Sequence, residues 1–278
     1  MVQLQLNIDP KKVTLQHAMG KLIPIHSSRQ QALPIVQKYV INELLPALKQ
    51  KGPVTIRPAE FGRSSHVYFI EGLQSTPLIL RGETDKRAMR RRVTGHELLL
   101  QHGFNVPEIV YQDWRSSVKR DYGFFFIVET YIAGQFFNDV PDSETAATRL
   151  GQMLARMHQL TCWQYGWPGE FRWPGSIVAW IKFRNKIHNQ LSSYSKRNKK
   201  TSTIISKWLN EQPLGAWFPK PRLTTGGFIS SNLIVDKKFE VFIIDLARVR
   251  YAFAARDIAQ IKFVLTKYDQ KARTAFLR

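Results

Sequence analysis

A short hairpin with polar ends constrains the fold of this chain more than any other stretch. The segment Pro221–Arg250 reads PRLTTGGFISSNLIVDKKFEVFIIDLARVR. Its apolar runs predict two strands, Asn232–Val235 and Val241–Ile244, which a polar turn joins. Asn232 begins the first strand and Asp245 follows the second. The hairpin thus carries an amide and a carboxylate, oxygen donors of the kind that Mg²⁺ prefers, at its opposite ends.

The charge of the chain restricts the partners that it can attract. Lys plus Arg is 41 and Asp plus Glu is 21, which gives a formal net charge of +20 over 278 residues. Such an excess attracts polyanions such as nucleic acid, anionic lipid and nucleotide phosphates, although a basic solvated surface has the same composition. The sequence contains no zinc-finger spacing and no RNP-like segment. Specific recognition of nucleic acid therefore has little support and stays an alternative.

Other bulk features favour a globular protein in the cytoplasm. Hydrophobic residues make up 44% of the chain and aromatic residues 12%. No apolar run reaches the roughly 20 residues that span a bilayer, and the first residues do not resemble a secretory signal. The single cysteine, Cys162, excludes an internal disulfide and a cysteine-based zinc site. We expect a cytoplasmic location, with peripheral contact at the inner face of an anionic membrane as an option.

Hydrophobic periodicity predicts a helix and then a small sheet in the first part of the chain. Apolar residues recur at three- and four-residue intervals over 29–50, which predicts a packed accessory helix. The shorter period over 53–81 predicts strands around a loop that holds Gly62, Ser64 and Ser65. Such a loop can present backbone N–H groups and hydroxyls to phosphates, although the same residues occur in many β-turns.

The middle of the chain alternates between helical and extended patterns. A basic helix is expected over 86–101, and its run Arg90–Arg92 is either a solvated face or a binding surface for an anionic partner. A buried strand over 122–131 and an amphipathic helix over 143–160 follow. Residues 162–220 mix tryptophans with basic residues, which favours a helical substrate-binding subdomain over a platform for single-stranded nucleic acid.

The order of these elements resembles the aminoglycoside phosphotransferase and choline kinase group of kinase-like proteins. The matching pieces are FGRSS, LILR, GHELLLQHG with NVPEIV, FFFIVET, LGQMLARMHQL, LTTGGFISSNLIV, VFIIDLARVR and RDIAQI. The resemblance implies an α+β, two-lobed protein-kinase-like fold, with a small antiparallel sheet in the first lobe and a mainly helical second lobe. The phrase IIDLARVR followed by RDIAQIKF is also similar to lipopolysaccharide core sugar kinases. That branch would explain the basic charge as affinity for a phosphorylated glycolipid.

The resemblance also implies a domain organisation and two cofactors. Residues 1–52 would form an N-terminal extension with the accessory helix, and 53–131 would form a nucleotide-binding lobe. Residues 132–278 would form a helical lobe that carries the catalytic-loop segment and the metal-site hairpin. ATP and Mg²⁺ are the cofactors expected of such a protein, and a small molecule or glycolipid is the expected substrate.

Carried over by position, the resemblance assigns a nucleotide site and places Asn232 and Asp245 on the metal ligands. Arg81 stands where a kinase places its phosphate-pairing lysine, and Glu97 stands where a carboxylate holds that cation. An arginine keeps the charge, but its fork geometry differs from that of lysine. Glu129 and Tyr131 fall at the hinge, where backbone groups would meet an adenine edge. The expected nucleotide-binding residues are therefore Gly62, Ser64, Ser65, Arg81, Glu97, Glu129 and Tyr131.

The catalytic-loop segment departs from the pattern of the family that it resembles. That pattern is His-Gly-Asp, with its Asp five residues before the metal-binding Asn. Here the segment is Thr225-Gly226-Gly227, and Gly227 lies five residues before Asn232. The base position therefore lacks a carboxylate, and Thr225 replaces the histidine that braces the loop. Asp257 matches a structural Asp that steadies the loop in the family.

Three hypotheses for the function stay open. The first is a pseudokinase-like protein with impaired catalysis that retains binding of ATP and Mg²⁺. The second is an active ATP-dependent phosphotransferase of the aminoglycoside or lipopolysaccharide core type, because a general base contributes only roughly 10²–10⁴-fold. Positioning and metal electrostatics supply most of the catalysis of phosphoryl transfer. The third is a basic binding protein for nucleic acid or an anionic membrane that uses the fold as a scaffold.

Overall fold

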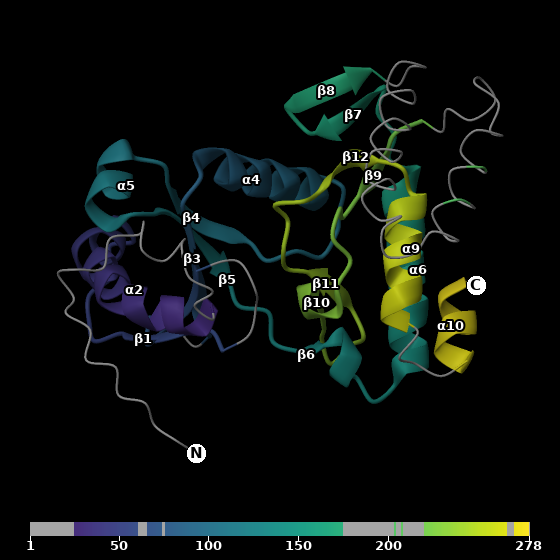
Figure 1. The fold of residues 1–278 in the computed structure, drawn as a ribbon. Coiled ribbons are helices and arrows are strands. Elements are labelled where there is room, and N and C mark those ends of the chain that lie inside the picture. The colour runs from purple at the N-terminus through teal and green to yellow at the C-terminus, as the bar shows by residue number, and fades with distance from the viewer. Residues whose placement is uncertain are drawn as a thin grey trace. The chain divides into compact units, whose positions relative to one another are not determined.

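The computed structural model of the chain describes residues 25–60, 66–73, 76–174, 203, 207, 220–265 and 270–277, and its elements are labelled in Figure 1. Contacts divide the chain into two units. The first unit holds Met1–Arg90, Asn105–Gln135 and Phe242–Ile244, and the second holds Arg91–Phe104, Phe136–Val241 and Asp245–Arg278. Each unit has its own sheet and helices.

A five-stranded sheet of order β1-β2-β3-β5-β4 forms the centre of the first unit. All of its neighbouring strands are antiparallel. The strands are β1 Thr55–Pro58, β2 His66–Glu71, β3 Leu78–Glu83, β4 Ile109–Asp113 and β5 Phe125–Thr130. The strands predicted between 53 and 81 and over 122–131 are confirmed. The short helix α5, Ser116–Tyr122, was not predicted; it lies between β4 and β5 and ends at Gly123 in the left-handed conformation.

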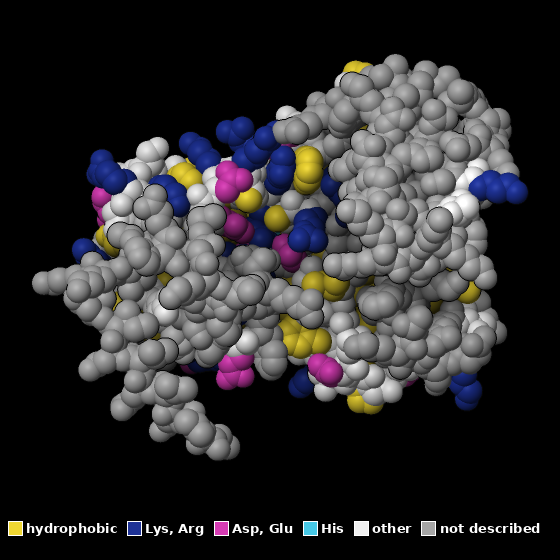
Figure 2. Space-filling model, in the orientation of Figure 1, with side chains coloured by type: hydrophobic (Ala, Val, Ile, Leu, Met, Phe, Trp, Pro, Cys, Tyr) yellow, Lys and Arg dark blue, Asp and Glu magenta, His cyan; other side chains and the backbone are white. Residues whose placement is uncertain are grey.

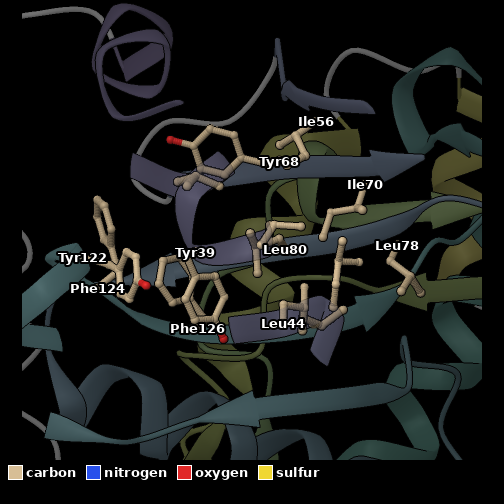
Figure 3. Close-up of a cluster of buried hydrophobic side chains, with 14 of the residues drawn as sticks. Tyr39, Leu44, Ile56, Tyr68, Ile70, Leu78, Leu80, Tyr122, Phe124 and Phe126 are labelled. Carbon is tan, nitrogen blue, oxygen red and sulfur yellow. The ribbon is translucent and has the colours of Figure 1, made fainter. Parts of the chain in front are cut away.

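The accessory helix predicted over 29–50 is confirmed, and it packs on this sheet. It comprises α2 Ile25–Tyr39, a π-helical turn η2 Val40–Leu44 and α3 Leu45–Ala47. Helix α2 contacts β1, β2 and α5. In the core between them, the Tyr39 ring stacks on Phe126 with centroids 3.7 Å apart and meets the edge of Tyr122 at 5.4 Å (Figure 3). The aromatic contacts make α2 part of the core of this unit.

Buried polar groups fix the position of α2 as firmly as the apolar contacts do. The Arg29 guanidinium is buried and donates a hydrogen bond to the Ala59 carbonyl at 2.6 Å. The Tyr68 hydroxyl donates to the Arg29 carbonyl at 3.1 Å. The Tyr39 hydroxyl donates to Asp113 at 3.3 Å, and burial raises the pKa of Tyr39 far above its usual range. Because buried polar groups without partners are costly, these bonds determine how the helix meets the sheet.

The second unit combines helices with short strands. Its helices are α6 Ser143–Gln159, α9 Ala255–Leu265 and α10 Gln270–Leu277, together with most of α4 Lys86–Gln101. The Asp142 side chain caps α6 by accepting a hydrogen bond from the Thr145 N–H at 3.0 Å. The helices predicted over 86–101 and 143–160 are confirmed with nearly the same bounds.

The small sheets gather short strands that are distant in the sequence. One sheet has the order β8-β7-β12-β9, and the other has the order β11-β10-β6. The strands are β6 Gln135–Phe136, β7 Gln164–Trp167, β8 Glu170–Pro174, β9 Arg222–Thr224, β10 Leu233–Val235, β11 Val241–Ile243 and β12 Arg250–Ala252. Strands β10 and β11 confirm the predicted hairpin. Strands β7 and β8 form the start of the aromatic stretch 162–220, and most of that stretch lies outside the described residues.

No helix in the described part of the chain is long and apolar enough to cross a membrane.

His66 provides a pH-dependent test of the first unit. Burial, followed by the charge of Arg29, lowers the pKa of His66 to about 4. Since the folded pKa lies below the unfolded value, neutral His66 stabilises the fold above pH 6.5, and this contribution is lost as the pH falls towards 4. Between pH 7 and pH 4, we expect the free energy of unfolding to fall further in the wild type than in His66→Gln. The expected difference is about 2 kcal/mol, which is less than the full pKa shift would give because His66 is partly exposed.

Urea titrations of both proteins across this pH range measure the difference. If the free energy of unfolding changed with pH in the same way in both proteins, His66 would not titrate below its ordinary pKa.

Candidate functional site

Arg81 and Glu129 form a buried ion pair in the first unit. Strands β3 and β5 are paired with Arg81 opposite Ile127 and Ile79 opposite Glu129, so the two side chains are diagonal neighbours on one face. The Arg81 Nε donates to the Glu129 carboxylate at 2.6 Å, and the side chains are 10% and 3% exposed. The Arg81 Nη2 also donates to the Ile244 carbonyl at 2.9 Å. The guanidinium is therefore held at two points.

The nucleotide-binding residues expected from the sequence are only partly brought together. Gly62, Ser64 and Ser65 lie outside the described residues. Glu97 was expected to hold the Arg81 cation, but it is exposed on α4, and the carboxylate that pairs with Arg81 is that of Glu129. The Tyr131 ring is half-buried and lies 6.0 Å from that of Phe69, edge to face. The register between β3 and β5 brings Arg81 next to Glu129. The sequence does not show this register, because it contains only two separate apolar runs.

The catalytic-loop segment is anchored to helix α9 in the second unit. Asp257, which is fully buried, accepts a hydrogen bond from the Thr225 N–H at 2.9 Å and contacts the Thr225 hydroxyl at 3.3 Å. The His158 Nε2 lies 3.4 Å from the same carboxylate. One turn later, the Gln260 side chain accepts from the Phe228 N–H at 3.0 Å. Asp257 thus steadies the loop as expected, and His158 is a structural histidine in this arrangement.

The base position of this loop faces an arginine. Gly226 has φ +67°, and a Cβ at this position would collide with the carbonyl of Arg248. A Cβ on Gly227 would lie 3.0 Å from the Arg248 Cδ and 3.7 Å from its Nη1. Where the family pattern has a carboxylate, this loop therefore has a glycine beside the Arg248 side chain. The role of Arg248 was not predicted, because its position in the sequence does not show which loop it contacts.

The two predicted metal ligands each have a neighbour in the structure. Asn232 lies in the 3₁₀ turn η4, Ser230–Asn232, and its side-chain N–H donates to the Gly227 carbonyl at 3.3 Å, which leaves the amide oxygen as an acceptor. The Asp245 carboxylate lies 3.2 Å from the Arg92 guanidinium, with side chains 27% and 2% exposed respectively. Among the described residues, no group of three or more His, Cys, Asp or Glu side chains could hold a metal ion.

In the type of its donors, this pair fits a magnesium ion whose other ligands are phosphates and waters. One carboxylate and one amide oxygen match the one or two protein ligands that Mg²⁺ takes when phosphates and waters supply the others. The residues that would hold it are Asp245 and Asn232. Arg92 would have to share Asp245 with the ion, and this competition lowers the affinity for the metal.

The basic run at the start of α4 divides into three different environments. Arg92 is buried against Asp245, and the Arg91 guanidinium binds Glu170 at 3.0 Å and lies 3.7 Å from the centre of the Trp167 ring. Arg90 is exposed, as are Lys86 and Arg87. Figure 2 shows Lys and Arg side chains gathered along this helix. The prediction of a uniformly solvated or anion-binding run was wrong for Arg91 and Arg92, because both pair with carboxylates of the second unit.

The comparisons with known proteins agree with this geometry. Residues 55–278 match the phosphotransferase enzyme family, so the chain belongs to this family. No protein in a search of curated sequences matches the chain significantly.

Solved structures show the same fold at low sequence identity. Aminoglycoside phosphotransferase APH(4)-Ia is 12% identical, with a TM-score of 0.60 over 88% of this chain and 81% of that one. The GDP complex of aminoglycoside 2'-phosphotransferase-IIIa is 13% identical, with a TM-score of 0.59 over 86% and 82%. A candidate fructosamine-3-kinase from Thermobifida fusca is 17% identical, with a TM-score of 0.55 over 82% and 78%. The α+β kinase-like fold is confirmed.

The Arg81–Glu129 pair predicts an asymmetry between single and double variants. Glu129→Leu or Arg81→Met alone leaves one charge buried without its partner, so each should lower the free energy of unfolding by about 3–5 kcal/mol. The double variant Arg81→Met/Glu129→Leu removes both charges and should recover most of that loss.

Denaturant titrations of the three variants measure this coupling, with Arg57→Met/Glu71→Leu, an exposed pair in the same sheet, as the control. Additive losses in the double variant would show that the two side chains do not act as a pair.

Proposed function

We propose that this protein is a pseudokinase-like member of the phosphotransferase family, which binds a nucleotide and a small-molecule or glycolipid ligand but transfers phosphate weakly or not at all. The observation that carries the proposal is position 227, where Gly227 stands in place of the catalytic carboxylate and faces Arg248. An acceptor hydroxyl at this loop would have no carboxylate to take its proton. General-base assistance of roughly 10²–10⁴-fold would be lost.

Retained features support nucleotide binding. Solved structures with this fold include a ternary complex with ADP and hygromycin B, one with AMP-PNP and hygromycin B, and a GDP complex. In this chain Arg81 is held in one orientation by Glu129 and the Ile244 carbonyl, which uses two of its five N–H groups and leaves others for a phosphate. Asn232 and Asp245 supply the oxygen donors for a magnesium ion, which would neutralise phosphate charge when bound.

The oxygen donors Asn232 and Asp245 also favour a second candidate function, which is an active phosphotransferase with an unusual catalytic-loop segment. Metal electrostatics and positioning supply most of the catalysis in phosphoryl transfer, and the loop is still anchored by Asp257. Turnover of the unmodified protein separates the two candidates.

Asp245→Asn tests the nucleotide site. This variant keeps the shape of the side chain but removes the charge that would hold Mg²⁺, so we expect ATP to bind the wild type and to bind Asp245→Asn at least about tenfold more weakly when Mg²⁺ is present. Calorimetric titration with and without Mg²⁺ measures this, with the exposed carboxylate variant Asp121→Asn as the control. Equal affinities in all three proteins would place the nucleotide elsewhere, and the absence of ATP binding to the wild type would overturn the proposal.

Gly227→Asp tests whether one substitution restores the chemistry. The new carboxylate would lie beside the Arg248 guanidinium, which lowers its pKa and its strength as a base. We therefore expect ADP release from ATP by Gly227→Asp to stay within about threefold of the wild type, since the benefit of a base depends on its pKa. Rapid ADP release by the wild type itself would instead identify an active enzyme.

A further inference from the structure

The geometry points to Arg248 as an oxyanion-binding residue at the vacant base position, so that the ligand held at the catalytic-loop segment carries a phosphate or carboxylate group. This inference rests on the proposed function, because it assigns a ligand class to the same site. A loop that takes a proton from a hydroxyl needs a basic side chain, such as a carboxylate or a neutral histidine. A loop with a guanidinium at that position binds a negative group instead.

The backbone around Gly226 fixes Arg248 against the loop. Gly226 adopts a left-handed conformation, and no side chain fits at this position because it would meet the Arg248 carbonyl. The main chain of Arg248 therefore lies directly against the loop. Its side chain then passes over Gly227, with Cδ 3.0 Å and Nη1 3.7 Å from the place where a Cβ would be.

Neighbouring carboxylates do not neutralise this guanidinium. Asp245, three residues earlier in the chain, is paired with Arg92, and Asp257 accepts hydrogen bonds from Thr225. Arg248 is exposed and forms no ion pair or side-chain hydrogen bond with the residues that the structure describes. A guanidinium can donate two parallel N–H hydrogen bonds to a phosphate or a carboxylate group.

The loop can add backbone donors to the same site. The N–H groups of Gly226 and Gly227 have no hydrogen-bond acceptor within the described ranges. A glycine in the left-handed conformation is typical of the concave backbone turns that bind anions. The positive charge of the whole chain, +20, would also favour an anionic ligand over a neutral one.

Binding of simple oxyanions tests the inference. Inorganic phosphate and acetate are titrated into the full chain at constant ionic strength, and binding is followed by calorimetry. We expect saturable binding of at least one of them, which weakens about tenfold in Arg248→Met and less in Arg248→Lys. Arg149→Met, which removes an exposed arginine of α6, should stay within about twofold of the wild type. The anion that binds more tightly identifies the chemical group of the ligand.

Two variants of similar size at position 227 separate the effect of a negative charge on phosphate binding from the effect of steric blocking. Gly227→Asp places a carboxylate beside the guanidinium and should abolish phosphate binding. Gly227→Asn has nearly the same size without the charge and should retain binding within about threefold. Equal losses in both variants, or binding that does not change in Arg248→Met, would overturn the inference.

Titration of phosphate with saturating ADP and Mg²⁺ keeps the two proposals distinguishable. Phosphate that is displaced by ADP occupies the nucleotide site, and this result would contradict the assignment to Arg248. Failure of the wild type to bind ATP would overturn the proposed function, whereas phosphate binding that is independent of Arg248 would overturn this inference alone.

Discussion

The buried carboxylate of Asp257 anchors the catalytic-loop segment in the second unit. It is fully buried and accepts the Thr225 backbone N–H, and it also meets the Thr225 hydroxyl and His158. A buried carboxylate is tolerated because these donors replace the water that it has lost. Since Thr225 begins the turn that carries Gly226 and Gly227, the anchor also determines where the base position lies and which side chain faces it. Asp257 therefore anchors a loop that carries Gly227 at the expected base position.

Three arginines lie beside residues that the sequence predicts to be functional. In the first unit Arg81 is paired with Glu129, and in the second Arg92 lies against the carboxylate of Asp245, the expected metal ligand. Arg248 lies beside the base position and has no carboxylate partner among the described residues. Guanidinium groups stay charged at any ordinary pH, so they cannot exchange protons with a substrate. This distribution of charge suits binding of phosphate and carboxylate groups better than it suits proton transfer.

Much of the fold could be predicted because its signals are local. The helices over 86–101 and 143–160 and the hairpin after Asn232 follow from apolar spacing within each segment. The sheet β8-β7-β12-β9 could not be predicted, because its strands have three to five residues and are brought together by pairing between segments that are distant in sequence. The basic run of α4 was misinterpreted for a related reason, since composition does not show that Arg92 turns towards a carboxylate.

The sequence by itself determined which chemical groups the site has. The spacing from Gly227 to Asn232 predicts that the base position lacks a carboxylate, and the ends of the hairpin predict Asn232 and Asp245 as oxygen donors. These conclusions need only the identity of residues within one short segment. Tertiary structure decided which groups face each other: Glu129 pairs with Arg81, Arg92 with Asp245, and Arg248 lies over Gly227. Such contacts depend on strand register, helix rotation and loop conformation, which arise only when distant segments pack together.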